Sequence, residues 1–328
     1  MPLPPMQFKP LLKPKVWGGR SLELLGKQLP PEEPVGESWE LADLPDEIAG
    51  GRSLIAGGPF DGQSLQDVLE HDALALLGRT SRSPEGGFPL LLKYLDAHDN
   101  LSVQVHPDDA YVADHPEAHL KSEAWFILEA QPGSVIYAGL KPGTTPEDFA
   151  SSIEDGTVVD HLVAIPARPG DCHYLPSGTC HALGAGVLVA EVQTPSDTTF
   201  RVWDWGRTSR ELHVEQAMAC IDFSGTSIEQ PRPHPTTTGN HRLTRLADTD
   251  YFRIERVESF DPGEMILETQ GVPEAFMVLD GEGTLSVADH SMSLKRGDTF
   301  LLPADMEQGV MKMKKPMDFL KTTMLPST

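Results

Sequence analysis

The feature that most constrains this chain is a short phrase that occurs twice. One copy spans residues 170–181 (GDCHYLPSGTCH) and the other spans residues 297–308 (GDTFLLPADMEQ); in both, Pro follows the first Gly by six positions. A second phrase precedes each copy, as EAWFIL at 123–128 and as EAFMVL at 274–279. A chain that repeats such units is better explained as two copies of one β module than as one irregular domain. The two copies differ at their last residue, which is His in the first and Gln in the second.

The composition favours a β-rich protein and restricts its partners. The chain has 29 Gly and 29 Pro among 328 residues, which suits many short strands joined by turns. Its net charge of −23 disfavours binding to nucleic acid or to an anionic membrane surface. A small anionic substrate is compatible with this charge, because a metal ion can make one pocket locally positive.

The cysteine count and the N-terminal sequence bear on where the protein resides. Three cysteines make a poor disulfide framework and indicate a reducing compartment. The first ten residues contain no apolar run typical of a signal peptide, and no stretch of about 18 apolar residues occurs. We therefore expect a cytoplasmic protein. Separately, we expect a monomer or a weak homo-oligomer.

Apolar spacing and turn residues predict many strands and a few short helices. Helix signals with a capping residue and a terminal Gly occur at 64–78 and 145–156, and a third helical stretch is expected at 211–221. Residues 123–139 alternate around a Gln-Pro-Gly turn and predict a β-hairpin. Nearly all of 243–326 is predicted to form short strands.

The domain organisation follows from one stretch rich in Pro and Thr at 226–242, which is the best linker candidate. It predicts a first domain over residues 1–235 and a second over residues 241–328. We expect a mainly β fold of two jelly-roll barrels, with a few short helices inserted only in the first. The second barrel lacks the histidine of the repeated phrase, so we expect its role to be structural.

Four candidate metal ligands lie on the expected strands of the first module. Gln104 and His106 are two positions apart, so on a strand both side chains face the same side. Glu123 begins the next strand, and His181 ends the repeated phrase. Two histidines, one carboxylate and one amide oxygen suit zinc or another divalent first-row ion. A Gln-x-His pair alone is more often an ordinary surface or core pair. The repeated phrase favours metal binding, because its second copy keeps the turn residues needed for the fold but has Gln308 in place of the metal-binding histidine.

Several phrases of the chain resemble those of a known family. Segment 170–181 matches the second cupin motif, and residues 102–107 (SVQVHP) with 121–123 (KSE) resemble the first motif as type I mannose-6-phosphate isomerases have it. Further matches are VWGG at 16–19, GESWEL at 36–41 and SDTTFR at 196–201. The resemblance covers essentially the whole chain. In its length and small helical insert, the chain is similar to the short bacterial form of the family.

The resemblance implies a zinc-dependent isomerase that interconverts mannose 6-phosphate and fructose 6-phosphate through a cis-enediolate. The implied ligands of one zinc ion per chain are Gln104, His106, Glu123 and His181. The implied catalytic residues are Lys121, Asp197 and Arg201. The implied substrate-binding residues are Lys93, Ser102 and Glu191.

The chemistry of aldose–ketose interconversion agrees with this set. A proton moves between C1 and C2, and a metal can act as a Lewis acid on the oxygens that gain charge. A fixed cation such as Arg201 adds electrostatic stabilisation, and a positioned acid or base moves the proton. Lys121 can serve in that way if the nearby metal lowers its pKa, although the sequence leaves the proton-transferring group open. The local donors for phosphate are Lys93, Ser102 and Arg201.

Two other functions could use the same scaffold. An iron dioxygenase would need open metal positions for oxygen, but such sites usually contain more histidines, and Gln104 disfavours that reading. A sugar-binding or storage protein with a relict metal site is the second alternative. It has no need for Lys121, Asp197 or Arg201, and their presence favours the isomerase.

Overall fold

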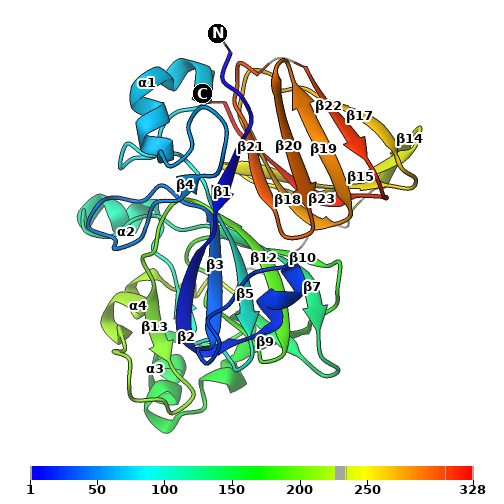
Figure 1. The fold of residues 1–328 in the computed structure, drawn as a ribbon. Helices are drawn as coiled ribbons and strands as arrows, with labels where there is room; N and C mark the ends of the chain where they lie inside the picture. Colours follow the sequence, from blue (N-terminus) through cyan, green and yellow to red (C-terminus); the bar gives the residue numbers. More distant parts are fainter. Residues whose placement is uncertain (1, 226–232, 234, 307, 327–328) are drawn as a thin grey trace.

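The computed structural model describes residues 2–225, 233, 235–306 and 308–326. Its strands form four sheets that are arranged as two barrel-like pairs, one for each copy of the repeated phrases. In Figure 1 the first pair forms the lower body, coloured blue to green, and the second forms the upper right body, coloured yellow to red. The predicted mainly β fold of two jelly-roll modules is confirmed.

The first module consists of a six-stranded and a five-stranded sheet. In spatial order, the six-stranded sheet contains β10 (Cys172–Leu175), β7 (Glu123–Ala130), β12 (Val187–Gln193), β5 (Leu91–Ala97), β3 (Val35–Leu41) and β2 (Leu11–Gly19). The five-stranded sheet contains β13 (Phe200–Trp203), β6 (Val103–Val105), β11 (His181–Leu183), β8 (Val135–Leu140) and β9 (Leu162–Pro166).

The second module consists of an eight-stranded and a four-stranded sheet. The eight-stranded sheet contains β14 (Pro235–Thr238), β15 (His241–Asp248), β16 (Phe252–Ser259), β23 (Asp318–Met324), β18 (Glu274–Asp280), β21 (Thr299–Leu302), β1 (Met6–Lys9) and β4 (Leu54–Ile55). The four-stranded sheet contains β17 (Gly263–Leu267), β22 (Gly309–Met313), β19 (Glu282–Val287) and β20 (His290–Lys295). Strands β1 and β4 come from the start of the chain, and Met6 of β1 pairs with Leu301 of β21.

The two repeated phrases form the same strand pair in both modules. In the first module β7 pairs with β10, and Glu123 lies opposite Leu175. In the second module β18 pairs with β21, and Glu274 lies opposite Leu302. In each case the glutamate faces the residue just before the Pro of the repeated phrase. The sequence repeat therefore corresponds to a structural repeat.

The interiors of the two barrels differ. The second is filled by apolar side chains, including Phe276, Phe300 and Phe319, each 0% exposed. The rings of Phe276 and Phe300 stack with their centroids 4.7 Å apart. At the positions of Phe276 and Phe300 in the repeat, the first module has Trp125 and His173. At one of these two positions the second module therefore has a phenylalanine where the first has a histidine, and the phenylalanine rings pack against each other.

The predicted helices are present, and within the described residues every α-helix comes from the part of the chain before residue 226. The α-helices are α1 (Leu65–Leu77), α2 (Asp109–Asp114), α3 (Pro146–Asp155) and α4 (Val214–Cys220). Helix α1 contacts the second module, where the backbone N–H of Ala304 donates to the carbonyl of Leu76. The 3-10 helices are η1 (Ser21–Leu25) and η2 (Val158–His161). No helix in the described part of the chain has both the length and the apolar character required to cross a bilayer.

Helix α1 begins with the capping box that the sequence predicts. The Ser64 hydroxyl accepts a hydrogen bond from the Asp67 backbone N–H, and the Asp67 carboxylate accepts one from the Ser64 N–H. Substitution Ser64→Ala is expected to lower the free energy of unfolding by about 1 kcal/mol, measured from urea denaturation curves. The control is Ser151→Ala in exposed mid-helix surroundings, expected to change it by less than about 0.5 kcal/mol. Equal effects of the two substitutions would contradict the capping role.

The predicted hairpin at 123–139 is wrong. Strand β7 pairs with β10 and β12, whereas β8 pairs with β11 and β9 in the other sheet. The alternating pattern identified two strands correctly, but both bury apolar side chains in the same core, where Trp125 and Ile136 lie. The turn between them therefore crosses from one sheet of the barrel to the other.

The linker predicted at 226–242 lies partly outside the described residues, at 226–232 and 234. Its end, Pro235–Thr238, forms the edge strand β14 and pairs with β15. An edge strand tolerates proline because one of its sides needs no hydrogen-bond donors.

Candidate metal centre and active-site cavity

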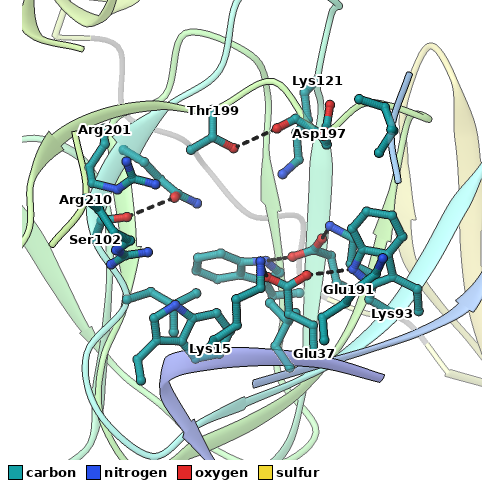
Figure 2. A pocket seen from close by; sticks show the side chains of 18 of the residues that line it. Lys15, Glu37, Lys93, Ser102, Lys121, Glu191, Asp197, Thr199, Arg201 and Arg210 are labelled. Carbon is teal, nitrogen blue, oxygen red and sulfur yellow. Dashed lines mark hydrogen bonds and ion pairs between the residues drawn. The ribbon is translucent and has the colours of Figure 1, made fainter. Parts of the chain in front are cut away.

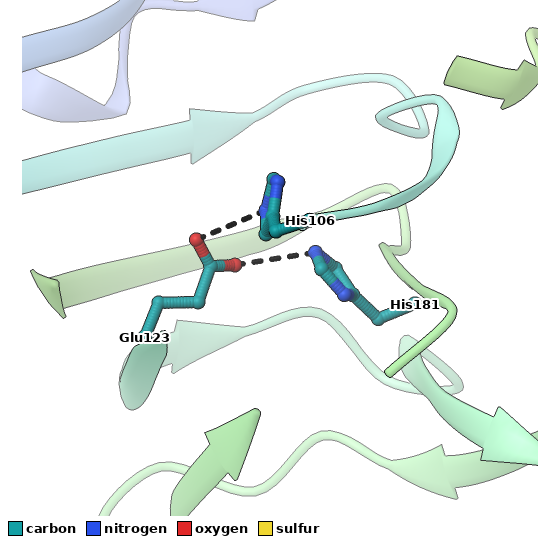
Figure 3. Close-up of side chains that lie close together, drawn as sticks. All are labelled: His106, Glu123 and His181. Carbon is teal, nitrogen blue, oxygen red and sulfur yellow. Dashed lines mark ion pairs between the residues drawn. The ribbon is translucent and has the colours of Figure 1, made fainter. Parts of the chain in front are cut away.

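Three buried side chains converge inside the first barrel, each from the end of a strand. His106 directly follows β6, Glu123 is the first residue of β7, and His181 is the first residue of β11. Each is at most 1% exposed. The Glu123 carboxylate lies between the imidazoles, with Oε2 3.3 Å from His106 Nε2 and Oε1 3.2 Å from His181 Nε2 (Figure 3). The candidate ligand atoms all lie within 4.8 Å of one another.

The backbone fixes the orientation of both imidazoles. His106 Nδ1 is 3.0 Å from the carbonyl oxygen of Thr198, and His181 Nδ1 is 2.8 Å from that of Thr179. A carbonyl only accepts hydrogen bonds, so each Nδ1 carries a proton, and in a neutral imidazole Nε2 then presents its lone pair toward Glu123. His106 Nε2 and Glu123 Oε1 are buried without hydrogen-bond partners, and Glu123 Oε2 is paired with the Lys121 ammonium at 3.1 Å. A cation placed among these atoms would satisfy both of the unpartnered ones, so the residues fit a divalent ion.

Burial and neighbouring charges favour the protonation states that bind metal. Burial, with a contribution from the Lys121 ammonium, lowers the pKa of His106 to about 3. Burial opposes ionisation of Glu123, but Lys121 and His106 overcome it and hold the pKa of that carboxyl well below its usual range. Neutral imidazole and ionised carboxylate are the forms that coordinate a metal.

Gln104 stands next to this centre in a row of residues that crosses three strands. Arg201 of β13 lies opposite Gln104 of β6, and Gln104 lies opposite His181 of β11. Gln104 Nε2 is 3.3 Å from His181 Nε2, and Gln104 Oε1 accepts a hydrogen bond of 3.3 Å from the Ser102 hydroxyl. The row places one amide and one guanidinium beside the candidate metal ligands.

A cavity of about 540 Å³ lies beside the centre (Figure 2). All six residues that the sequence predicts for catalysis and substrate binding line it: Lys93, Ser102, Lys121, Glu191, Asp197 and Arg201. Its lysines and arginines are Lys13, Lys15, Lys93, Lys121, Arg201 and Arg210. Its carboxylates are Glu37, Glu47, Glu191 and Asp197. Cations outnumber carboxylates here, in a chain whose net charge is −23.

One wall of the cavity is a second row of residues, in the six-stranded sheet. Trp125, Glu191, Lys93 and Trp39 lie opposite one another on adjacent strands. Lys93 Nζ is 3.2 Å from Glu191 Oε1, and the Trp125 indole donates to Glu191 Oε2 at 2.9 Å. Burial and the nearby Glu123 raise the pKa of Glu191, although Lys93 opposes this. Figure 2 shows Glu191 and Lys93 on one side of the cavity and Arg201, Arg210 and Ser102 on the other.

Lys121 and Arg201 differ in how their charges are balanced. Lys121 Nζ lies 3.1 Å from Glu123 Oε2; burial opposes its charge, but Glu123, Glu191 and Glu37 outweigh burial and raise the pKa of Lys121 above its usual value. Arg201 instead donates to the backbone carbonyl of Glu211 at 2.6 Å, and its buried Nε has no hydrogen-bond partner. Burial and the nearby Arg210 lower the pKa of Arg201. Its charge is thus left for an anion in the cavity.

Several residues that line the cavity were not predicted from the sequence. Lys13 and Lys15 alternate with Trp17 on one side of β2, and that period of two was the signal available for them. Glu37 lies in a phrase that matched the family, and Lys93 and Lys15 lower its pKa to about 2 against the effect of burial. Arg210 comes from an irregular loop, and no spacing in the sequence identifies it.

Comparison with known proteins agrees with the geometry. Residues 6–124 match the family model of the phosphomannose isomerase type I catalytic domain. The chain is 34% identical over 306 residues to mannose-6-phosphate isomerase ManA of Bacillus subtilis, covering 91% of this chain and 93% of that protein. It is 32% identical over 304 residues to mannose-6-phosphate isomerase of Streptococcus mutans, covering 91% of this chain and 92% of that protein. The crystal structure of the mannose 6-phosphate isomerase from Bacillus subtilis is similar with a TM-score of 0.88 at 30% identity, over 98% of this chain and 99% of that one. The chain therefore belongs to the type I mannose-6-phosphate isomerase family.

Proposed function

We propose that this chain is a zinc-dependent isomerase that interconverts mannose 6-phosphate and fructose 6-phosphate through a cis-enediolate. The observation that carries the proposal is the buried cluster of His106, Glu123 and His181 beside a cavity that is rich in cations and is lined by Gln104 and Lys121. The family membership supports the reaction, and the excess of lysine and arginine around the cavity suits a phosphorylated sugar.

The proposed ligands of one zinc ion per chain are Gln104, His106, Glu123 and His181. When bound, the ion supplies Lewis acidity toward the substrate oxygens that gain negative charge. Two neutral imidazoles and a carboxylate form a donor set common for catalytic zinc. Gln104 joins them through its amide oxygen only if its amide group rotates, because its nitrogen now faces His181.

The proposed catalytic residues surround the position where C1 and C2 of the sugar would react. Arg201 supplies a fixed positive charge for the developing oxyanion, since it lies next to Gln104 and has no carboxylate partner among the described residues. We assign proton transfer to Lys121 because it lines the cavity 3.1 Å from Glu123. The carboxylates around it raise its pKa, so the lowered pKa expected from the sequence would have to come from a bound metal ion. We assign the third catalytic role to Asp197, which lines the same cavity.

The proposed substrate-binding residues are Lys93, Ser102 and Glu191. Lys93 and Ser102 donate hydrogen bonds to the substrate, and the Glu191 carboxyl orients Lys93 through their 3.2 Å ion pair. The partner we propose is a small sugar phosphate and not nucleic acid or a membrane, in keeping with the net charge of −23. We propose that the chain acts as a monomer or a weak homo-oligomer.

We also propose a division of roles between the modules. Residues 1–235 carry the catalytic site, and residues 241–328 form a second module without a metal site. Within the described residues, the cluster around Glu123 is the one group of three or more metal-binding side chains. The apolar packing around Phe276 and Phe300 leaves the second barrel without such a set.

The proposal is tested on the purified full chain by elemental analysis and by turnover of fructose 6-phosphate. We expect close to one zinc ion per chain and a loss of at least ~10³-fold in turnover after chelation, restored by added zinc, because Lewis-acid catalysis contributes several kcal/mol. Bound iron together with oxygen uptake would instead identify a dioxygenase. Bound metal without turnover of any sugar phosphate would identify a sugar-binding protein.

A further inference from the structure

The cations of the cavity fall into two groups according to their partners. Four are paired with a carboxylate: Lys15 with Glu37, Lys93 with Glu191, Lys121 with Glu123, and Arg210 with Asp204. The other two are Lys13 and Arg201, and among the described residues neither has a carboxylate within ion-pair distance. An anionic ligand gains most from cations that are not already neutralised.

These two cations lie at different distances from the metal centre. Arg201 is opposite Gln104, which is itself opposite His181, so it lies within two strands of a metal ligand. Lys13 is on β2, at the edge of the six-stranded sheet, and three strands separate it from Glu123 on β7. Adjacent strands are about 4.8 Å apart, so Lys13 lies at the end of the cavity that is away from Glu123.

The hydrogen-bond partners of Lys13 among the described residues are neutral groups, which a charged ligand could replace. Its ammonium donates to the backbone carbonyls of Gly50 at 2.8 Å and Ala49 at 3.3 Å, and it lies 4.4 Å from the ring centroid of Trp39. Lys15 projects from the same side of β2, is 35% exposed, and also lines the cavity. Burial is the main effect that lowers the pKa of Lys13, with Lys15 and Lys93 adding to it and the carboxylates of Glu37 and Asp197 opposing it. A dianion placed here would relieve the repulsion among these lysines.

We propose that Lys13 binds the phosphate group of the substrate, with Lys15 beside it, at the end of the cavity opposite the metal centre. The inference rests on the proposed isomerase function and extends it to the orientation of the substrate. The carbons that react are C1 and C2, whereas the phosphate is on C6, at the other end of the hexose. With C1 and C2 beside the metal centre and Arg201, the phosphate extends toward β2, where Lys13 exchanges the neutral carbonyls of residues 49–50 for a charged acceptor.

The experiment compares Lys13→Gln, Lys13→Arg and the wild-type full chain, with inorganic phosphate as the probe. Loss of one charge-assisted contact is expected to raise both the KM for mannose 6-phosphate and the inhibition constant of phosphate by about 10–100-fold, with a much smaller change in kcat. Lys13→Arg, which retains the charge, should recover most of both. The matched control is Lys9→Gln, whose lysine is exposed on β1 and pairs with Asp61 outside the cavity. That variant should keep wild-type constants.

Other results would overturn the inference. An unchanged inhibition constant for phosphate in Lys13→Gln, or a fall in kcat with unchanged KM, would do so. A larger rise for Arg210→Gln than for Lys13→Gln would place the phosphate at the arginines instead. If Lys13→Gln does not fold, Lys13→Met, which retains the packing on Trp39, takes its place. Phosphate binding is also measured by titration calorimetry, so a wild-type chain that binds phosphate through Lys13 without isomerising sugars would refute the proposed function and leave the phosphate site standing.

Discussion

Substitution His181→Ala is expected to abolish metal binding and isomerase activity together. His181 supplies one of two imidazoles whose Nε2 atoms face Glu123, and its Nδ1 is held by the carbonyl of Thr179. Its removal leaves a buried carboxylate with one fewer ligand partner and opens a space that water can enter. We expect kcat/KM to fall by at least ~10³-fold and the zinc content to fall close to zero, as measured by elemental analysis and a coupled assay.

The second module supplies a matched control for this substitution. Gln308 occupies the position of His181 in the second copy of the phrase, but its side chain is exposed, whereas His181 is buried. Gln308→Ala should therefore keep full zinc content and activity. Full metal occupancy in His181→Ala would refute the proposed ligand set, and loss of zinc in Gln308→Ala would show that the second module contributes to the metal site.

Substitution Arg201→Ala is expected to separate metal binding from turnover. Arg201 lies opposite Gln104 on the neighbouring strand, and its guanidinium makes its described hydrogen bond to a backbone carbonyl, that of Glu211. Zinc content and the unfolding midpoint should therefore stay near those of the wild type. Because preorganised charges at the reacting atoms typically contribute 10²–10³-fold, kcat should fall by about that factor.

A neighbouring arginine provides the control for Arg201. Arg207 is held by Asp204 but does not line the cavity, so Arg207→Gln should change kcat by less than about threefold. Steady-state kinetics on both variants, with zinc measured on the same samples, checks the expectation. Normal kcat in Arg201→Ala would reject its catalytic role, and loss of zinc would assign it a structural one.

The metal centre was predictable from the sequence because it depends on local geometry. The spacing of Gln104 and His106 places both on one side of a strand, and the phrase that ends in His181 contrasts with a copy that retains the turn and loses the ligand. The structure brings His106, Glu123 and His181 together, as that spacing indicates. The roles of these residues in zinc binding and catalysis stay predictions for the variants above.

The parts that were not predicted depend on which strands become neighbours. Alternation identifies β7 and β8 as strands but contains no information about their partners, so the expected hairpin was wrong. Lys13 and Lys15 are cavity residues only because β2 joins the edge of the sheet that also carries Lys93. Arg210 lies in an irregular loop. The path of this loop is set by tertiary contacts such as the ion pair between Arg210 and Asp204.

The pairing of β1 with β21 has a consequence for the synthesis of the protein. Met6 and Leu301 are about 295 positions apart, so in an emerging chain β1 can pair with β4 early, but its residues that pair with β21 must wait until almost all of the polypeptide has left the ribosome. Closing so large a loop is slow, and an unpaired apolar strand can meanwhile associate with other nascent chains. We therefore expect the two fragments to stay bound to each other after proteolytic cutting between the modules. The reason is that β1, in the N-terminal fragment, remains paired with β21 of the second barrel.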